Sequence, residues 1–121
     1  MTPDDELRWL TLCPLTDWPD RSARGFDPLH SGCDALFIVR IGVALHAWHN
    51  ACPHVAGAPM AWRKDAYLSA DGRHITCAAH GAQFDIATGV CILGPCLGQA
   101  LSPAKVRVHA NGDVQWRPAA P

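Results

Sequence analysis

The chain carries little net charge and has no long apolar run. Its ten basic and eleven acidic residues leave a formal net charge of −1, so net charge indicates neither nucleic acid nor an anionic membrane as a partner. No stretch approaches the ~18 apolar residues of a membrane span. The acidic start, residues 1–6, lacks the basic and apolar regions of a signal peptide. We therefore expect a soluble cytoplasmic protein.

Internal repeats, low-complexity stretches and linkers are also missing. A length of 121 residues suits one domain, residues 1–121, and an apolar fraction of 49% is enough to fill a single core. We therefore expect no second, catalytic domain.

Short apolar runs alternate with turn residues every eight to twelve positions, which is typical of small antiparallel sheets. The sequence therefore predicts an all-β fold. Residues 14–30 show no period and predict a loop, residues 62–68 predict a short helical turn, and Asn111-Gly112 predicts a type I′ hairpin turn. The predicted strands are residues 7–13, 35–40, 43–49, 73–76, 83–86, 90–93, 105–109 and 114–117.

Two short motifs hold the residues with metal-binding chemistry. Cys52 and His54 form a Cys-x-His motif, and Cys77 and His80 form a Cys-x-x-His motif. Turn residues follow each motif, so each is predicted at a loop tip. Two soft thiolates and two imidazoles suit a 2Fe-2S centre in which histidines replace two cysteines on one iron. The same four side chains could also bind a structural zinc tetrahedrally, which leaves a zinc-stabilised binding module as an alternative.

The segment from residue 50 to residue 98 resembles a Rieske domain of the soluble ferredoxin type. The distinctive parts are CPH, CxxHGAxFD, the TG turn after it and GPC at residues 94–96. The resemblance implies a Rieske fold with two cluster-binding loops at one end. It also implies one 2Fe-2S cluster, with Cys52 and Cys77 on one iron and His54 and His80 on the other. The 22 residues from 55 to 76 exceed the commonest Rieske spacing by a few, and we expect an insertion around residues 65–72.

The resemblance further implies an electron carrier rather than an enzyme. Similar ferredoxins take single electrons from a flavin-containing reductase and pass them to a ring-hydroxylating oxygenase. A Rieske small subunit of a larger reductase, such as nitrite reductase, is the alternative within this class. Oxygenase chemistry would need a second iron on two histidines and a carboxylate, and the remaining histidines form no recognisable set.

High-potential Rieske proteins join their cluster loops by a disulfide and direct two hydroxyl groups at sulfur atoms. The resemblance places Gly57 and Ala79 where those cysteines would fall, and Ala82 and Phe84 where the hydroxyl donors would be. Without these donors the reduced cluster is less stabilised, so we predict a midpoint potential within about 100 mV of −150 mV.

The other cysteines and the rim of the cluster complete the predictions. Cys13 and Cys33 are expected to be small buried residues. Cys91 and Cys96 bracket the predicted proline loop, and whether they form a disulfide stays open. A small apolar contact patch for redox partners is expected from Val55, Pro59, Met60, Pro95 and Leu97.

Overall fold

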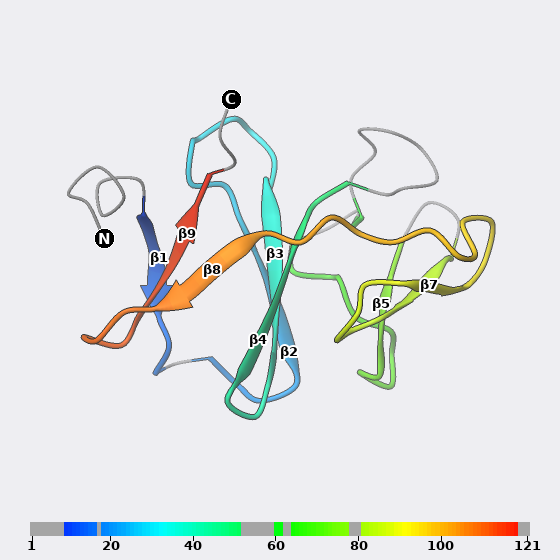
Figure 1. The fold of residues 1–121 in the computed structure, drawn as a ribbon, viewed down its shortest axis with the longest axis horizontal. Helices are drawn as coiled ribbons and strands as arrows, with labels where there is room; N and C mark the ends of the chain where they lie inside the picture. Colours follow the sequence, from blue (N-terminus) through cyan, green and yellow to red (C-terminus); the bar gives the residue numbers. More distant parts are fainter. Residues whose placement is uncertain (1–8, 17, 52–59, 62–63, 78–80, 119–121) are drawn as a thin grey trace.

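The computed structural model describes residues 9–16, 18–51, 60–61, 64–77 and 81–118. Within these residues the fold contains no helix, and its strands form three antiparallel sheets of three strands each (Figure 1). The predicted all-β fold of small antiparallel sheets is confirmed. The strands are β1 (Leu10–Pro14), β2 (Ser22–Phe26), β3 (Leu36–Ile41), β4 (Ala44–His49), β5 (His74–Thr76), β6 (Gln83–Asp85), β7 (Cys91–Leu93), β8 (Lys105–Val108) and β9 (Asp113–Arg117).

The sheet β2-β3-β4 lies between the other two, and both of its faces are covered (Figure 1). Strand β3 begins with four consecutive apolar residues, Leu36 to Val39, which are all fully buried. Because neighbouring residues of a strand point to opposite faces, Leu36 and Ile38 enter one core while Phe37 and Val39 enter the other. A strand buried on both faces explains why this run does not alternate with polar residues.

The sheet β1-β9-β8 brings the first and last described strands together. Val114 and Trp116 of β9 pack with Leu36 and Ile38 in one core. The β8–β9 connection is not the predicted type I′ turn, which needs positive φ at two consecutive residues. Within this turn only Gly112 has a positive φ (94°), and the His109 carbonyl accepts the Gly112 N–H at 2.8 Å. This is a type I turn followed by a left-handed glycine.

The sheet β5-β6-β7 forms the opposite end of the molecule from β1 (Figure 1). Ile75 and Phe84 face each other across β5 and β6, and both are fully buried in the second core with Phe37 and Val39. The β6–β7 turn is closed by Asp85, whose carboxylate accepts the N–H of Thr88 at 2.8 Å and its hydroxyl at 2.9 Å. This sheet supports the predicted cluster-binding end.

Two predictions of local structure are wrong. Residues 14–30 contain the strand β2, which the sequence did not predict because Arg24 and Gly25 interrupt its apolar pattern. β2 pairs with β3, beginning with Ser22 opposite Arg40, and this pairing stabilises a strand that its own residues do not favour. Where a helical turn was expected, the described residues show a turn at residues 64–65 and a bridge between Leu68 and Ile75.

Candidate metal centre

Cys77 stands at the base of the second predicted cluster loop. It follows β5 directly and its side chain is fully buried. The Cys77 N–H donates to the Ala82 carbonyl at 2.8 Å, and the Gly81 N–H donates to the Cys77 carbonyl at 2.8 Å. Gly81 adopts φ 67°, a left-handed conformation that favours glycine. These bonds bring the chain back on itself, so that residues 78–80 connect two fixed ends.

Asn50 fixes the two ends of the first predicted cluster loop. Its side-chain oxygen accepts the backbone N–H of Met60 at 2.8 Å, and its side-chain NH₂ donates to the Asp34 carbonyl at 2.9 Å. The Asn50 N–H also donates to the Ala35 carbonyl at 3.0 Å. The side-chain amide of Asn50 therefore joins Met60, which follows the loop, to residue 50, which precedes it. The same amide anchors both ends of the loop to Asp34, just before β3. The sequence analysis did not identify this role, although an Asn two residues before a predicted ligand is a signal for it.

The bases of the two loops meet in one core. Met60, Cys77, Ala82 and Cys96 belong to the same buried cluster as Phe84. Of the four predicted ligands only Cys77 lies in the described residues; Cys52, His54 and His80 lie outside them, as do Gly57 and Ala79. Among the described residues, no group of three or more His, Cys, Asp or Glu side chains could hold a metal ion.

The described part of the site fits a cysteine ligand of an iron-sulfur cluster. Cys77 is buried in an apolar core, so its thiol is shielded from water, and the closed loop base gives it a fixed position. Ala82 and Phe84 are both fully buried and have no hydroxyl group. The surroundings of Cys77 therefore agree with a cluster that receives few hydrogen bonds from side chains.

The loop after β7 packs directly against this site. Gly94 lies so close to Ala82 that an added Cβ would be 2.9 Å from the Ala82 Cα, and its φ is 110°. In the chain around Gly94 the side chains of Ile92, Leu93 and Leu97 are 45%, 57% and 68% exposed. We call Ile92, Leu93, Pro95 and Leu97 the apolar rim; all four are exposed.

The rim differs from the contact patch expected from the sequence. Pro95 and Leu97 are exposed as predicted, but Met60 is fully buried in the core and contributes no contact surface. Its backbone N–H donates to the Asn50 side chain, and its side chain belongs to the same buried cluster as Cys77 and Ala82. Val55 and Pro59 lie outside the described residues. Ile92 and Leu93 were not predicted to contribute, because β7 is too short to show which of its residues face outward.

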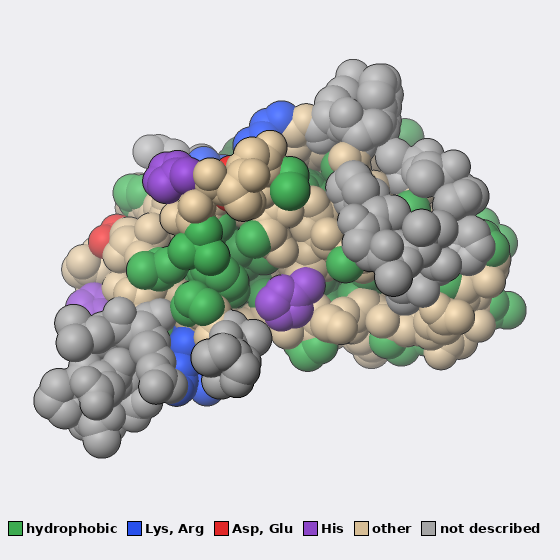
Figure 2. Space-filling model, turned by 90° about the horizontal axis from the view of Figure 1, so that it is seen from above, with side chains coloured by type: hydrophobic (Ala, Val, Ile, Leu, Met, Phe, Trp, Pro, Cys, Tyr) green, Lys and Arg blue, Asp and Glu red, His purple; other side chains and the backbone are tan. Residues whose placement is uncertain are grey.

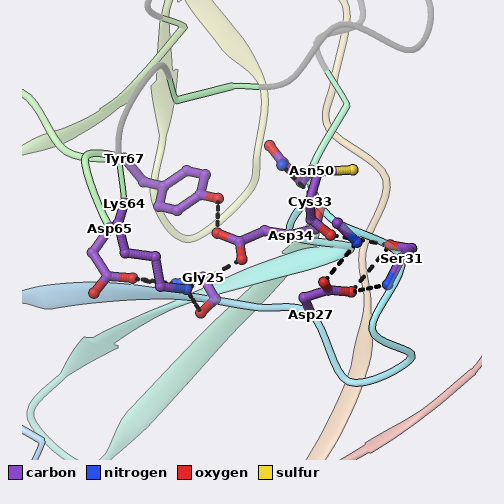
Figure 3. A network of polar contacts seen from close by, with 10 residues as sticks. Gly25, Asp27, Ser31, Cys33, Asp34, Asn50, Lys64, Asp65 and Tyr67 are labelled. Atoms are coloured by element: carbon purple, nitrogen blue, oxygen red, sulfur yellow. Dashed lines mark hydrogen bonds and ion pairs between the residues drawn. The ribbon is translucent and has the colours of Figure 1, made fainter.

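A polar network supports the segment between the two loops (Figure 3). The Asp34 carboxylate accepts the Tyr67 hydroxyl at 2.7 Å and pairs with the Lys64 ammonium at 3.1 Å. Lys64 also donates to the Gly25 carbonyl, and the Asp65 carboxylate accepts the Gly25 N–H at 2.8 Å. Burial, then the hydrogen bond to Asp34, raises the pKa of Tyr67, so its hydroxyl stays a donor.

This network shows how the segment predicted as an insertion is held. Tyr67 stacks on Phe37 with ring centroids 4.3 Å apart, which ties the segment to β3. A Cβ added at Gly25 would collide with the Asp34 carboxylate and lie 2.7 Å from the Tyr67 hydroxyl oxygen, so a larger residue there would displace this network. Sequence reasoning missed these contacts because Asp34 and Tyr67 are 33 positions apart and neither lies in a motif.

One face of the molecule carries few charged side chains among the described residues. Figure 2 shows one face of the molecule, on which charged side chains are few and apolar side chains gather beside a histidine.

Cys33 is exposed, so the prediction that it is buried is wrong, whereas Cys13 is buried as expected. Among the described residues, no helix is long and apolar enough to cross a membrane.

Comparisons with known proteins found similar solved structures. A chain in the complex of reduced oxygenase and oxidized ferredoxin of carbazole 1,9a-dioxygenase is 26% identical, with a TM-score of 0.68 over 91% of this chain and 93% of that one. The ferredoxin of Sphingomonas yanoikuyae B1 is 25% identical, with a TM-score of 0.65 over 91% and 98% of the two chains.

A third solved structure shares the fold. The ferredoxin of carbazole 1,9a-dioxygenase from Nocardioides aromaticivorans IC177 is 22% identical, with a TM-score of 0.68 over 92% and 98% of the chains. A search of the curated proteins found no match. The Rieske [2Fe-2S] domain family matches residues 8–119. This protein therefore belongs to the Rieske 2Fe-2S domain family, whose single cluster makes it an electron-transfer protein.

Proposed function

We propose that this chain, as a single domain of residues 1–121, is a cytoplasmic Rieske ferredoxin that passes single electrons from a flavin-containing reductase to an oxygenase. The observation that supports the proposal is the close approach of Gly94, in the chain segment that bears the apolar rim, to Ala82 at the base of the second cluster loop. A carrier needs a redox centre beside a surface that a partner can cover, and a cluster held by this loop would have such a surface nearby.

The cluster would be held by Cys52, His54, Cys77 and His80. When bound it accepts and releases one electron, and histidine ligation places its potential above that of an all-cysteine cluster. The part of the protein is to hold the ligands: Asn50 closes the loop that bears Cys52 and His54, and the hairpin base positions Cys77. The described surroundings of Cys77 are apolar, which limits water on that side.

The apolar rim suits a transient partner. It is a small surface of four exposed side chains, far smaller than the interface of a permanent complex. With a net charge of −1, long-range electrostatic steering contributes little to the encounter. We therefore expect weak docking with a shallow dependence on salt. The comparisons support this partner class, because one similar chain comes from a complex of an oxygenase with a ferredoxin.

The ligand assignment is tested by spectroscopy of purified variants. Wild-type protein should be red-brown and, after reduction with dithionite, should show the low average g value of a histidine-ligated 2Fe-2S centre. Cys77→Ser should abolish or strongly weaken cluster assembly, and His54→Cys should retain a cluster with a shifted spectrum. Cys33→Ser, at an exposed cysteine, is the matched control and should leave the spectrum unchanged. A colourless protein that contains zinc would contradict the assignment.

The docking surface is tested by electron transfer from the reduced protein to a Rieske oxygenase component. Leu97→Asp places a charge on the rim and should slow the second-order rate about tenfold or more, the equivalent of 1.4 kcal/mol of docking energy. Val43→Asp is the control, because Val43 is 99% exposed in the β3–β4 turn, outside the rim. Equal slowing by both variants would rule out the rim. Purification in a tight complex with a large reductase would favour the reductase-subunit alternative instead.

A further inference from the structure

A pair of buried cysteines lies beneath the apolar rim. The Cys96 thiol donates to the Cys91 sulfur with the two Sγ atoms 3.1 Å apart, and the side chains are 0% and 1% exposed. A disulfide bond has an S–S length of about 2.05 Å. The two sulfurs therefore need to approach by about 1 Å to form one.

The backbone conformation of the rim brings the Cys91 and Cys96 sulfur atoms close together. Gly94 and Gly98 have φ values of 110° and 88°, which reverse the chain direction between β7 and residue 99. The Gly98 N–H donates to the Cys91 carbonyl at 3.2 Å, and the Gln99 N–H donates to the Cys96 carbonyl at 2.8 Å. The contact is therefore a consequence of a defined turn.

We propose that Cys91 and Cys96 form a thiol-disulfide pair that low-molecular-weight disulfides, such as oxidised glutathione, convert to a disulfide. Neither cysteine is one of the predicted cluster ligands, and the chemistry of the pair does not rest on the proposed partners. Since the ring from Cys91 to Cys96 includes Ile92 and Leu93, oxidation would also restrict the apolar rim.

The reaction is a two-electron exchange in two steps. A thiolate of the pair attacks the oxidised glutathione, which forms a mixed disulfide and releases one glutathione. The second thiol of the pair then displaces the other glutathione and closes the S–S bond. In total two S–H bonds of the protein and one S–S bond of the oxidant break. One S–S bond forms in the protein, and two molecules of glutathione carry away both electrons and both protons.

Access to the pair requires a local opening only. Every residue between the two cysteines, from Ile92 to Pro95, is exposed, and so are Leu97 and Gly98. Two backbone bonds of this turn are at the long end of the normal range, 3.2 Å from the Leu97 N–H to the Gly94 carbonyl and from the Gly98 N–H to the Cys91 carbonyl. The Gln99 N–H donates to the Cys96 carbonyl at 2.8 Å, and the Cys91 N–H to the Gln99 carbonyl at 2.7 Å. The turn can therefore open without the core strands separating. Because both thiols are buried in the closed form, we expect slow oxidation compared with that of exposed Cys33.

The experiment counts thiols in the cluster-loaded protein. The Cys33→Ser variant is used, because exposed Cys33 would itself take up glutathione. The protein is incubated with excess oxidised glutathione, and the reaction is quenched in acid. The protein is then unfolded and alkylated, and its molecular mass is measured. The expected result is the loss of two thiols without bound glutathione, reversal by dithiothreitol, and an unchanged visible spectrum of the cluster. Adding Cys13→Ser should leave this loss unchanged.

Adding Cys91→Ala or Cys96→Ala to the Cys33→Ser protein should prevent the loss of two thiols. Should an alanine variant fold poorly, the serine variant at the same position serves, and fragment masses of the oxidised Cys33→Ser protein locate the bond directly. The proposal is overturned by an unchanged thiol count, by a paired loss that persists without Cys96, or by a loss that occurs only after the cluster colour has bleached. None of these outcomes depends on an oxygenase or a reductase, so they do not bear on the proposed function.

Discussion

The Asn50 side chain offers the sharpest test of how the fold holds the first cluster loop. Asn50→Ala removes the hydrogen bond to the Met60 N–H and the one to the Asp34 carbonyl. Each such bond contributes about 0.5–1.5 kcal/mol net, and leaving the N–H of buried Met60 without a partner costs about 1–3 kcal/mol more. The expected loss of unfolding free energy is therefore about 2–6 kcal/mol.

The loss should appear first as faster cluster release. If the loop opens about 2 kcal/mol more easily, release should be about 30-fold faster, because 1.4 kcal/mol corresponds to a factor of ten. The assay follows the decay of the visible absorption of the cluster in excess chelator at fixed temperature. A thermal melt followed by far-ultraviolet circular dichroism measures the global effect in parallel.

Asn111→Ala is the matched control. Asn111 also makes two side-chain hydrogen bonds, one from the Asp113 N–H at 3.0 Å and one to the Asp113 carboxylate at 3.1 Å. Both are exposed and local to the β8–β9 turn, so the cost should stay below about 1 kcal/mol and cluster release should not change. Equal release rates for the two variants would refute the role assigned to Asn50.

Three further predictions concern the same end of the molecule. Gly94→Ala should cost about 1–3 kcal/mol more in a denaturant titration than Gly98→Ala. Both glycines have positive φ, but only Gly94 has a close neighbour, and equal costs would exclude the contact with Ala82. Phe84→Tyr should raise a midpoint potential of about −150 mV, and no change in a redox titration would mean that the residue does not reach a sulfur. Asp85→Asn should lower stability near neutral pH and flatten its acid dependence, measured by denaturation between about pH 5 and about pH 3.

The sign of the last prediction follows from the β6–β7 turn. The hydroxyl and the N–H of Thr88 donate to the Asp85 carboxylate and hold its pKa below the ordinary value of 3.8. A group whose pKa is lower in the folded state stabilises the fold above its unfolded pKa. That contribution is lost as the pH falls through the folded value. The asparagine variant lacks this group, so a stability curve as steep in acid as that of the wild type would contradict the assignment.

The sequence determined the chemistry and class of this protein because both depend on local patterns. CPH, CxxHGAxFD and GPC are contiguous, and short apolar runs between turn residues predicted an all-β fold, including the hairpin of β3 and β4. Strand β2 was missed because its order comes from pairing with β3 rather than from its own residues. The burial of Met60 was missed because its core neighbours, Cys77 and Ala82, come from a distant part of the chain.

Only the tertiary structure decided which residues support the site. The network of Asp34, Lys64 and Tyr67 joins residues 30 and 33 positions apart, and no spacing rule relates such residues. The sequence placed Cys91 and Cys96 on either side of a loop and left their pairing open; the folded turn brings their sulfurs to 3.1 Å. Local sequence thus encodes which atoms are available for chemistry. Packing and backbone hydrogen bonds between distant segments decide which of those atoms meet.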